Sequence, residues 1–179
     1  QPLFQSGRIY YFEKQAEVFF HAVQRSVNAS SERLGRSAIP ASPYRRMDAG
    51  AIGSRAAGYP LRLYPPGDVP LINTVNFLME TSFVDGGFFQ QISHSGINPY
   101  LTLHAAQVLL RAGDIRFFPM MSAIAGIATS TGQWPEAVHP RTLGGCMGDG
   151  QHVWAAAEWV LMVRNCFVYE EEKPARLIL

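Results

Sequence analysis

The chain lacks the features that mark several large classes of protein. Only 2 of its 179 residues are cysteines, too few for the disulfide framework of a small secreted domain. Charged residues make up 16% of the chain and its formal net charge is +1, so we expect no basic surface that could neutralise the phosphates of a nucleic acid. No apolar run reaches the roughly 18 residues that a membrane-spanning helix needs. These absences exclude nucleic acid and membrane as expected partners.

The composition instead favours a globular protein with an ordinary core. Hydrophobic residues make up 47% of the chain, enough for one domain, or part of a larger one, to bury an apolar interior. Two thiols and no secretory signal pattern predict a cytoplasmic location. The sequence stops on Leu177-Ile178-Leu179, within a predicted strand, so we expect a fragment of a longer polypeptide.

Helical periodicity is the dominant pattern, and we predict an all-α chain of antiparallel hairpins. Six stretches carry it: residues 10–34, 48–57, 70–83, 99–112, 115–129 and 151–164. Residues of the types that cap helices stand before four of them, namely Asp48, Asp68, Asn98 and Asp114. We expect residues 1–165 to form part of an α/α barrel. Residues 166–179 are expected to begin a β element, a short hairpin that is cut off.

One long loop, residues 131–150, concentrates groups that could carry chemistry. Trp134, Glu136, His139 and Arg141 fall within eight positions, and His152 follows shortly after. A carboxylate can activate a water molecule. Imidazole and guanidinium groups can donate hydrogen bonds to hydroxyls, and an indole can stack on a sugar ring. We therefore interpret the loop as the rim of a carbohydrate-processing site. The plain alternatives are a surface carboxylate, polar side chains that tie the loop to itself, and a buried indole that anchors it.

This segment resembles a known family. The order Glu136-x-x-His139-Pro140-x-Thr142-x-Gly144-Gly145, followed by Val153-Trp154-Ala155-Ala156-Ala157, is similar to the last loop and helix of α/α-barrel glycoside hydrolases. The relatives in question are processing α-glucosidases, trehalases and glucoamylases, and the resemblance covers residues 134–165. It implies that Glu136 is the general base of an inverting hydrolysis and that the chain is the C-terminal half of the catalytic domain. Residues 146–152 depart from the family pattern as an insertion.

An inverting site needs a second carboxyl group, roughly 6.5–9.5 Å from the first. Asp85 and Asp48 are the candidates within the chain, and an acid upstream of Gln1 is the third possibility. Asp85 also fits a turn, because it precedes two glycines, and Asp48 also fits a helix cap. His94 belongs to a second polar cluster, with Gln90, Gln91 and Asn98, that suits hydroxyl binding.

No cofactor and no metal are expected. Cys146, His139 and His152 share one segment, but their spacing matches no zinc pattern. Three functions stay open. The first is a glycoside hydrolase that acts through Glu136 and is inactive if the acid is missing. The second is a non-catalytic carbohydrate-binding or self-associating helical module of the same fold, and the third is a lyase or phosphorylase on the same scaffold. A half barrel would also expose helix faces and so favour a homo-oligomer.

Overall fold

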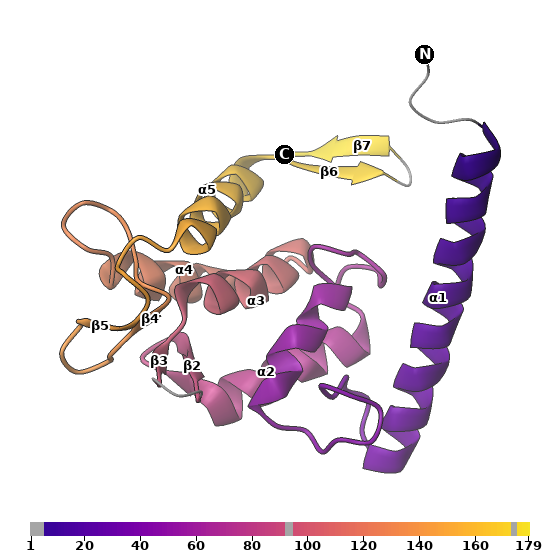
Figure 1. Ribbon diagram of the computed structural model, residues 1–179, viewed down its shortest axis with the longest axis horizontal. Helices are drawn as coiled ribbons and strands as arrows, with labels where there is room; N and C mark the ends of the chain where they lie inside the picture. The colour runs from indigo at the N-terminus through magenta and orange to yellow at the C-terminus, as the bar shows by residue number, and fades with distance from the viewer. Residues whose placement is uncertain (1–5, 92–94, 173–174) are drawn as a thin grey trace.

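The computed structural model describes residues 6–91, 95–172 and 175–179. All six expected helices are present in these ranges, with ends shifted by a few residues. They are α1 (Ser6–Leu34), the 3-10 helix η1 (Ala49–Ala57), α2 (Val69–Ser82), α3 (Pro99–Arg111), α4 (Phe117–Gly126) and α5 (Val153–Phe167). Helix α3 is central: α4 and α5 pack against it, and α2 packs against η1 (Figure 1).

The helix starts follow the capping prediction in two of four cases. The Asn98 side chain accepts a hydrogen bond from Leu101 N at 2.8 Å, and the Asp48 side chain accepts from Gly50 N at 2.8 Å. The prediction is wrong for Asp114, which accepts from the backbone N of Arg116 in the turn before α4 and does not cap the helix. It is also wrong for Asp68, which makes no side-chain cap. Pro70 in the first turn removes one of the N–H groups that a cap could reach. One buried oxygen of Asp68 consequently has no hydrogen-bond partner, and burial raises the pKa of this carboxyl.

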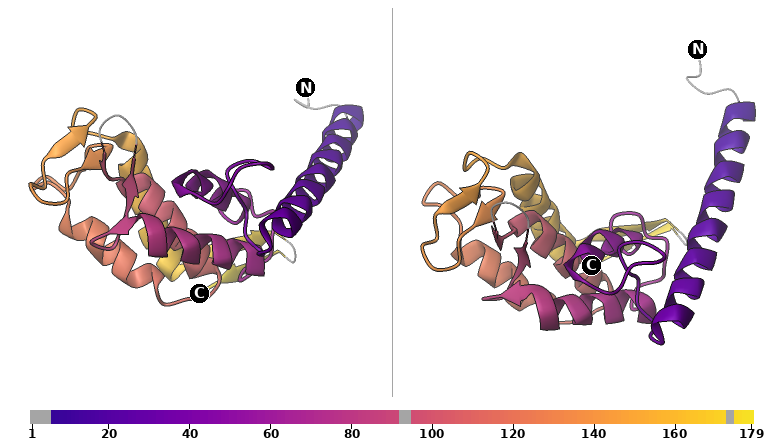
Figure 2. Two further views of the ribbon diagram at one scale, coloured as in Figure 1. Left: turned by 90° about the horizontal axis from the view of Figure 1, so that it is seen from below. Right: turned by 60° about the horizontal axis from the view of Figure 1, so that its bottom comes forward.

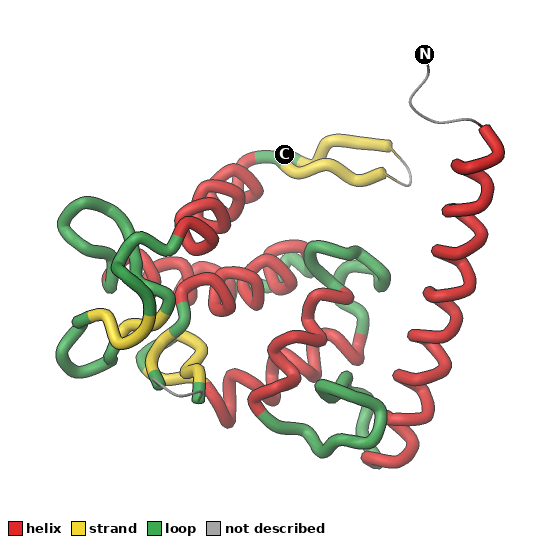
Figure 3. Tube along the Cα trace, in the orientation of Figure 1, coloured by secondary structure: helices red, strands yellow, loops and turns green. Residues whose placement is uncertain are grey.

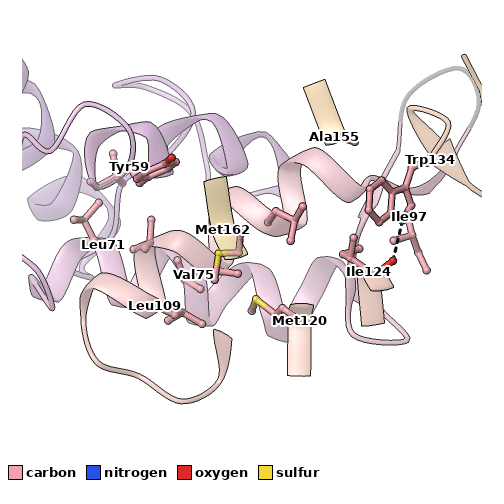
Figure 4. Close-up of a cluster of buried hydrophobic side chains, with 14 of the residues drawn as sticks. Tyr59, Leu71, Val75, Ile97, Leu109, Met120, Ile124, Trp134, Ala155 and Met162 are labelled. Carbon is pink, nitrogen blue, oxygen red and sulfur yellow. Dashed lines mark hydrogen bonds between the residues drawn. The ribbon is translucent and has the colours of Figure 1, made fainter. Parts of the chain in front are cut away.

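The main core lies where α2, α3, α4 and α5 meet (Figure 4). Val75, Leu109, Ile124 and Met162 contribute one fully buried side chain from each of these helices. Because truncating such a residue to alanine typically removes about 2–5 kcal/mol of stability, this cluster fixes the relative positions of the four helices. It therefore also fixes the loops at their ends.

The all-α prediction is wrong in one respect, because a five-stranded antiparallel sheet joins the loops. Its strands are β1 (Phe83–Val84), β2 (Gly87–Gln90), β3 (Gly96–Ile97), β4 (Ala137–Val138) and β5 (Gly145–Met147), paired in that order. Figure 3 shows these short strands together at one end of the helices. Strands of two to four residues are too short to show alternation in a sequence, and Ile97 pairs with Val138 across a whole helical hairpin. The molecule is mostly helical, with a small sheet that binds two predicted loops together.

The C-terminal hairpin is confirmed, with shifted boundaries. Strands β6 (Tyr169–Glu172) and β7 (Ala175–Ile178) pair antiparallel, and Tyr169 stands opposite Ile178. The first strand was expected from Cys166, but α5 continues to Phe167.

Helix α1 lies apart from the other helices in all three views (Figures 1 and 2). The apolar side chains along most of its length are uncovered: Phe12 is 59% and Phe19 is 68% exposed. Only the C-terminal end is covered: Val27 is buried, and the Ser30 hydroxyl donates to Pro43 O at 3.1 Å. Within the described residues no helix combines the length and apolarity that a membrane crossing requires.

Candidate functional site

Glu136 lies immediately before β4, in a loop that Trp134 anchors. The Trp134 indole is 3% exposed, its Nε1 donates to Ile124 O at 2.8 Å, and its ring packs 5.5 Å from that of Trp159. Figure 4 shows the indole turned into the core toward Ile124. Such a ring has no free face for a sugar. Our expectation that Trp134 binds substrate is therefore corrected to the anchoring alternative.

The Glu136 side chain is half-buried, and the segment that departs from the family pattern packs against it. A Cβ atom at Gly148 would lie 3.2 Å from Glu136 N and 3.3 Å from Glu136 Cβ. Gly148 also has a φ of +80°, a conformation that glycine adopts without strain. Gly148 thus packs closely against one side of Glu136, while the partial exposure of Glu136 leaves it accessible to water.

His139 and Arg141 shape the turn that follows. His139 Nδ1 accepts hydrogen bonds from Arg141 N at 3.2 Å and from Thr142 N at 3.3 Å. These bonds favour the alternative in which His139 ties the loop to itself. Arg141 is exposed, so its guanidinium is accessible to a ligand at the rim.

His152 connects this loop to a cavity that the sequence did not reveal. Its backbone N donates to Trp134 O at 2.8 Å. Its ring stands 5.8 Å from the ring of Trp154 and 6.4 Å from that of Tyr100. The Nδ1 atom of His152 is buried without a hydrogen-bond partner. This nitrogen can therefore still form a hydrogen bond where the loop meets the cavity.

The aromatic cavity, as we call it, has a volume of about 340 Å³ and lies between α3, α5 and the Tyr59-Pro60 turn. Its lining includes Tyr59, Pro60, Tyr100, His104, Trp154 and Glu158. Trp154 is 65% exposed and stands 5.7 Å from Tyr100. Of the two tryptophans of α5, Trp159 packs against the core and Trp154 lines the cavity. A partly exposed indole over a pocket of this size suits one ring-shaped ligand.

Below the cavity runs a buried polar chain of five residues from η1, α3 and α5: Arg55, His104, Glu158, Gln107 and Asn165. The Arg55 guanidinium donates to His104 Nδ1, which places the imidazole proton on Nε2. His104 Nε2 contacts Glu158 Oε2 at 2.9 Å, and Gln107 Nε2 donates to Glu158 Oε1 at 2.9 Å. Asn165 Nδ2 completes the chain by donating to Gln107 Oε1 at 3.0 Å.

Burial controls the charge states along this chain. It lowers the pKa of Arg55 to about 10, which still leaves the guanidinium protonated at neutral pH. Burial also lowers the pKa of His104, so that the imidazole is neutral. It raises the pKa of Tyr59, at the cavity wall, to about 12. One buried cation and one carboxylate therefore face each other across a neutral imidazole.

Asp48 lines a second cavity on the other side of the α3 N-terminus. This cavity has a volume of about 480 Å³, and its lining includes Arg45, Asp48, Phe88, Gln90 and Gln91. Asp48 Oδ2 accepts from Arg45 Nε at 2.6 Å, in addition to its cap. Gln90 Oε1 accepts from Asn98 Nδ2 at 2.6 Å.

Asp85 lines neither of these two cavities, and His94 falls outside the described residues. Asp85 is exposed and occupies the β1–β2 turn with a φ of +50°, followed by Gly86 at +82°. This conformation matches the turn alternative, so the catalytic role of Asp85 stays a prediction. In the part of the chain that the structure describes, no group of three or more His, Cys, Asp or Glu side chains is arranged to hold a metal ion.

Comparison with known proteins places this geometry on a known scaffold. No family model and no curated protein sequence matches the chain, but several solved glycosidase structures do. A single-residue variant of a glycosidase has a TM-score of 0.63 at 18% identity, with 84% of this chain and 44% of that chain covered. A wild-type glycosidase gives 0.62 at 18% identity with the same coverage, and a glycosidase variant in complex with glucose gives 0.62 at 17% identity. The chain thus has a glycosidase-like fold and spans less than half the length of these proteins.

Proposed function

We propose that the chain is part of an α/α-barrel glycoside hydrolase in which Glu136 activates a water molecule. The observation that carries the proposal is the junction at His152, which joins the Glu136 loop to the aromatic cavity. A water-accessible carboxylate and a ring-binding pocket on adjacent segments are two of the elements that glycoside hydrolysis requires, in addition to a general acid. The glycosidase-like fold supports the same reading.

Each element has a distinct role in this proposal. Glu136 takes a proton from water as the water attacks the anomeric carbon. The Trp154 and Tyr100 rings hold the C–H face of the sugar, and Arg141 donates to hydroxyls at the rim. Trp134 keeps the loop in place from within the core, so that the carboxylate is held at a fixed position.

The general acid is the missing component. Asp48 lines a different cavity and Asp85 lies at an exposed turn. We therefore expect the acid to come from a part of the full polypeptide outside this chain, and the chain alone to be inactive. This assignment implies the inverting geometry, with water between the two carboxyl groups.

Replacing Glu136 by glutamine in the full polypeptide tests the proposal. We expect hydrolysis of glucosides, measured as release of glucose, to fall by about 10²- to 10⁴-fold, because general-base assistance is typically of that size. Glu80→Gln, an exposed change on α2, is the matched control and should leave the rate unchanged. Equal rates for wild type and Glu136→Gln on every glucoside that is hydrolysed would end the proposal.

The uncovered stripe of α1 favours the second candidate, a self-associating or carbohydrate-binding module without catalysis. Phe12 and Phe19 expose large apolar areas, and surfaces of this kind mark association sites. Light scattering of the full polypeptide, in which the rest of a barrel would cover these faces, separates the two candidates. A dimer or larger species that Phe19→Ser converts to monomer would support the self-associating module, whereas a strictly monomeric polypeptide would count against it.

A further inference from the structure

Glu158 has hydrogen-bonding capacity beyond the buried polar chain. Its Oε1 accepts from Gln107 and its Oε2 from His104, which uses one acceptor position on each oxygen. A carboxylate oxygen offers two such positions. The residue also lines the aromatic cavity, although it is only 3% exposed. Its remaining capacity is therefore available to a ligand inside the cavity, and only there.

We infer that Glu158 accepts a hydrogen bond from one hydroxyl of a sugar ring bound in the aromatic cavity, and so decides which sugars bind. The inference rests on the proposed function in taking a carbohydrate as the ligand. Glu158 does not enter the reaction: it selects the ring that Glu136 acts on. A hydroxyl donor to a carboxylate is among the stronger hydrogen bonds in proteins.

The charge of Glu158 selects against an acidic ring. Arg55 and Glu158 have opposite charges on either side of His104, and burial keeps His104 neutral. A uronic acid would bring a second carboxylate close to that of Glu158, and the two like charges repel each other. A neutral pyranose brings hydroxyl donors for Glu158 and a C–H face for the Tyr100 and Trp154 rings.

The rigidity of the buried polar chain makes such a contact selective. His104 is fixed from three directions, by Arg55, by Glu158 and by the Tyr100 ring at 4.2 Å. Glu158 is fixed by His104 and Gln107. A carboxylate held in this way cannot follow a hydroxyl to a different position on the ring. A sugar that lacks the matching hydroxyl therefore loses the bond without compensation.

Titration of the full polypeptide with glucose and with its 2-deoxy, 3-deoxy and 6-deoxy analogues tests the inference, with tryptophan fluorescence or calorimetry as the readout. In the wild type we expect one analogue to bind about ten- to a hundredfold more weakly than glucose, the range for a hydrogen bond to a charged group. In Glu158→Gln the same analogue should bind within about twofold of glucose. Glucuronate should bind more weakly than glucose to the wild type.

Gln107→Met is the matched control. It removes one bond to Glu158 and disturbs the buried polar chain, but Gln107 does not line the cavity. We expect this variant to keep the wild-type preference between glucose and the deoxy analogue. If Gln107→Met loses the preference as completely as Glu158→Gln does, Glu158 acts only as a structural clamp and the inference is overturned. Equal binding of all analogues by the wild type, or no binding of any monosaccharide, overturns it as well.

The outcomes separate this inference from the proposed function. Loss of turnover in Glu136→Gln with intact glucose binding supports catalysis at Glu136 whatever Glu158 does. Selective binding through Glu158 in a protein that hydrolyses no glycoside would leave the inference standing on a carbohydrate-binding module.

Discussion

The chain holds two clusters of polar side chains that differ in almost every physical respect. The Glu136 loop is rich in charged and aromatic groups close together in the sequence, and its described hydrogen bonds hold the backbone of a turn. The buried polar chain gathers Arg55, His104 and Glu158 from three helices, and side chains bond to side chains. The residues of the first cluster are close together in the sequence and partly exposed to solvent, whereas those of the second are far apart in the sequence and buried.

The difference indicates what each cluster contributes to stability and to activity. Charged groups at the surface are screened by water and affect stability little, so the charged residues of the Glu136 loop can serve a reaction at little cost in stability. A buried charge with its partner removed is strongly destabilising, so the buried polar chain fixes the helices that bear the aromatic cavity. We therefore expect substitutions in the Glu136 loop to change mainly activity, and substitutions in the buried polar chain to change mainly stability.

The largest effect should follow from Glu158→Ala. This change leaves Arg55 buried without a carboxylate, and we expect a loss of about 3–5 kcal/mol in the free energy of unfolding. Urea unfolding monitored by circular dichroism measures it. Arg141→Ala in the loop should change the same quantity by less than about 0.5 kcal/mol. Similar losses for the two variants would remove the distinction between the clusters.

A smaller effect is expected from Trp134→Phe, which removes the bond from Nε1 to Ile124 O. A buried carbonyl that loses its donor costs about 1–3 kcal/mol, and thermal unfolding should show the loss. Trp154→Phe, at an exposed ring, should leave stability unchanged while it weakens glucose binding. The reverse pattern would mean that Trp134, and not Trp154, contacts the sugar.

Asp48→Ala should lower stability by about 0.5–2 kcal/mol, because η1 loses its N-cap. Asp48→Asn retains a capping oxygen and should recover most of the loss in chemical denaturation. If Asp48→Asn is as unstable as Asp48→Ala, the ion pair with Arg45 matters more than the cap.

The smallest effect should come from pH. Burial lowers the pKa of His104 in the folded protein below its ordinary value of 6.5. Below that pH the unfolded chain binds the proton first, so stability falls as the pH drops through 6.5 toward the folded-state pKa. The urea midpoint should decrease over this window, and the decrease should be weaker in His104→Gln. A His104→Gln variant with an unchanged pH profile would show that His104 does not cause the effect.

Most of the helical scaffold could be predicted from the sequence, and most of the cavity could not. Asn98 and Asp48 are recognisable as caps because a cap and its helix are neighbours in the chain. The aromatic cavity escaped prediction because Tyr59, Tyr100 and Trp154 are more than forty residues apart from one another. The anchoring of Trp134 was left open for the same reason, since its partner Ile124 lies in the preceding helix.

The sequence alone determined the six helices, two of the four proposed caps and the loop in which Glu136 lies, because each depends on residues within a few positions. Only the tertiary structure decided that short strands join the loops, that α1 lies apart from the core, and that Trp134 is buried while Trp154 is exposed. It also brought Arg55, His104 and Glu158 into one hydrogen-bonded chain. These features depend on which distant segments pack together, and helical periodicity shows that a residue faces a neighbour without showing which neighbour it faces.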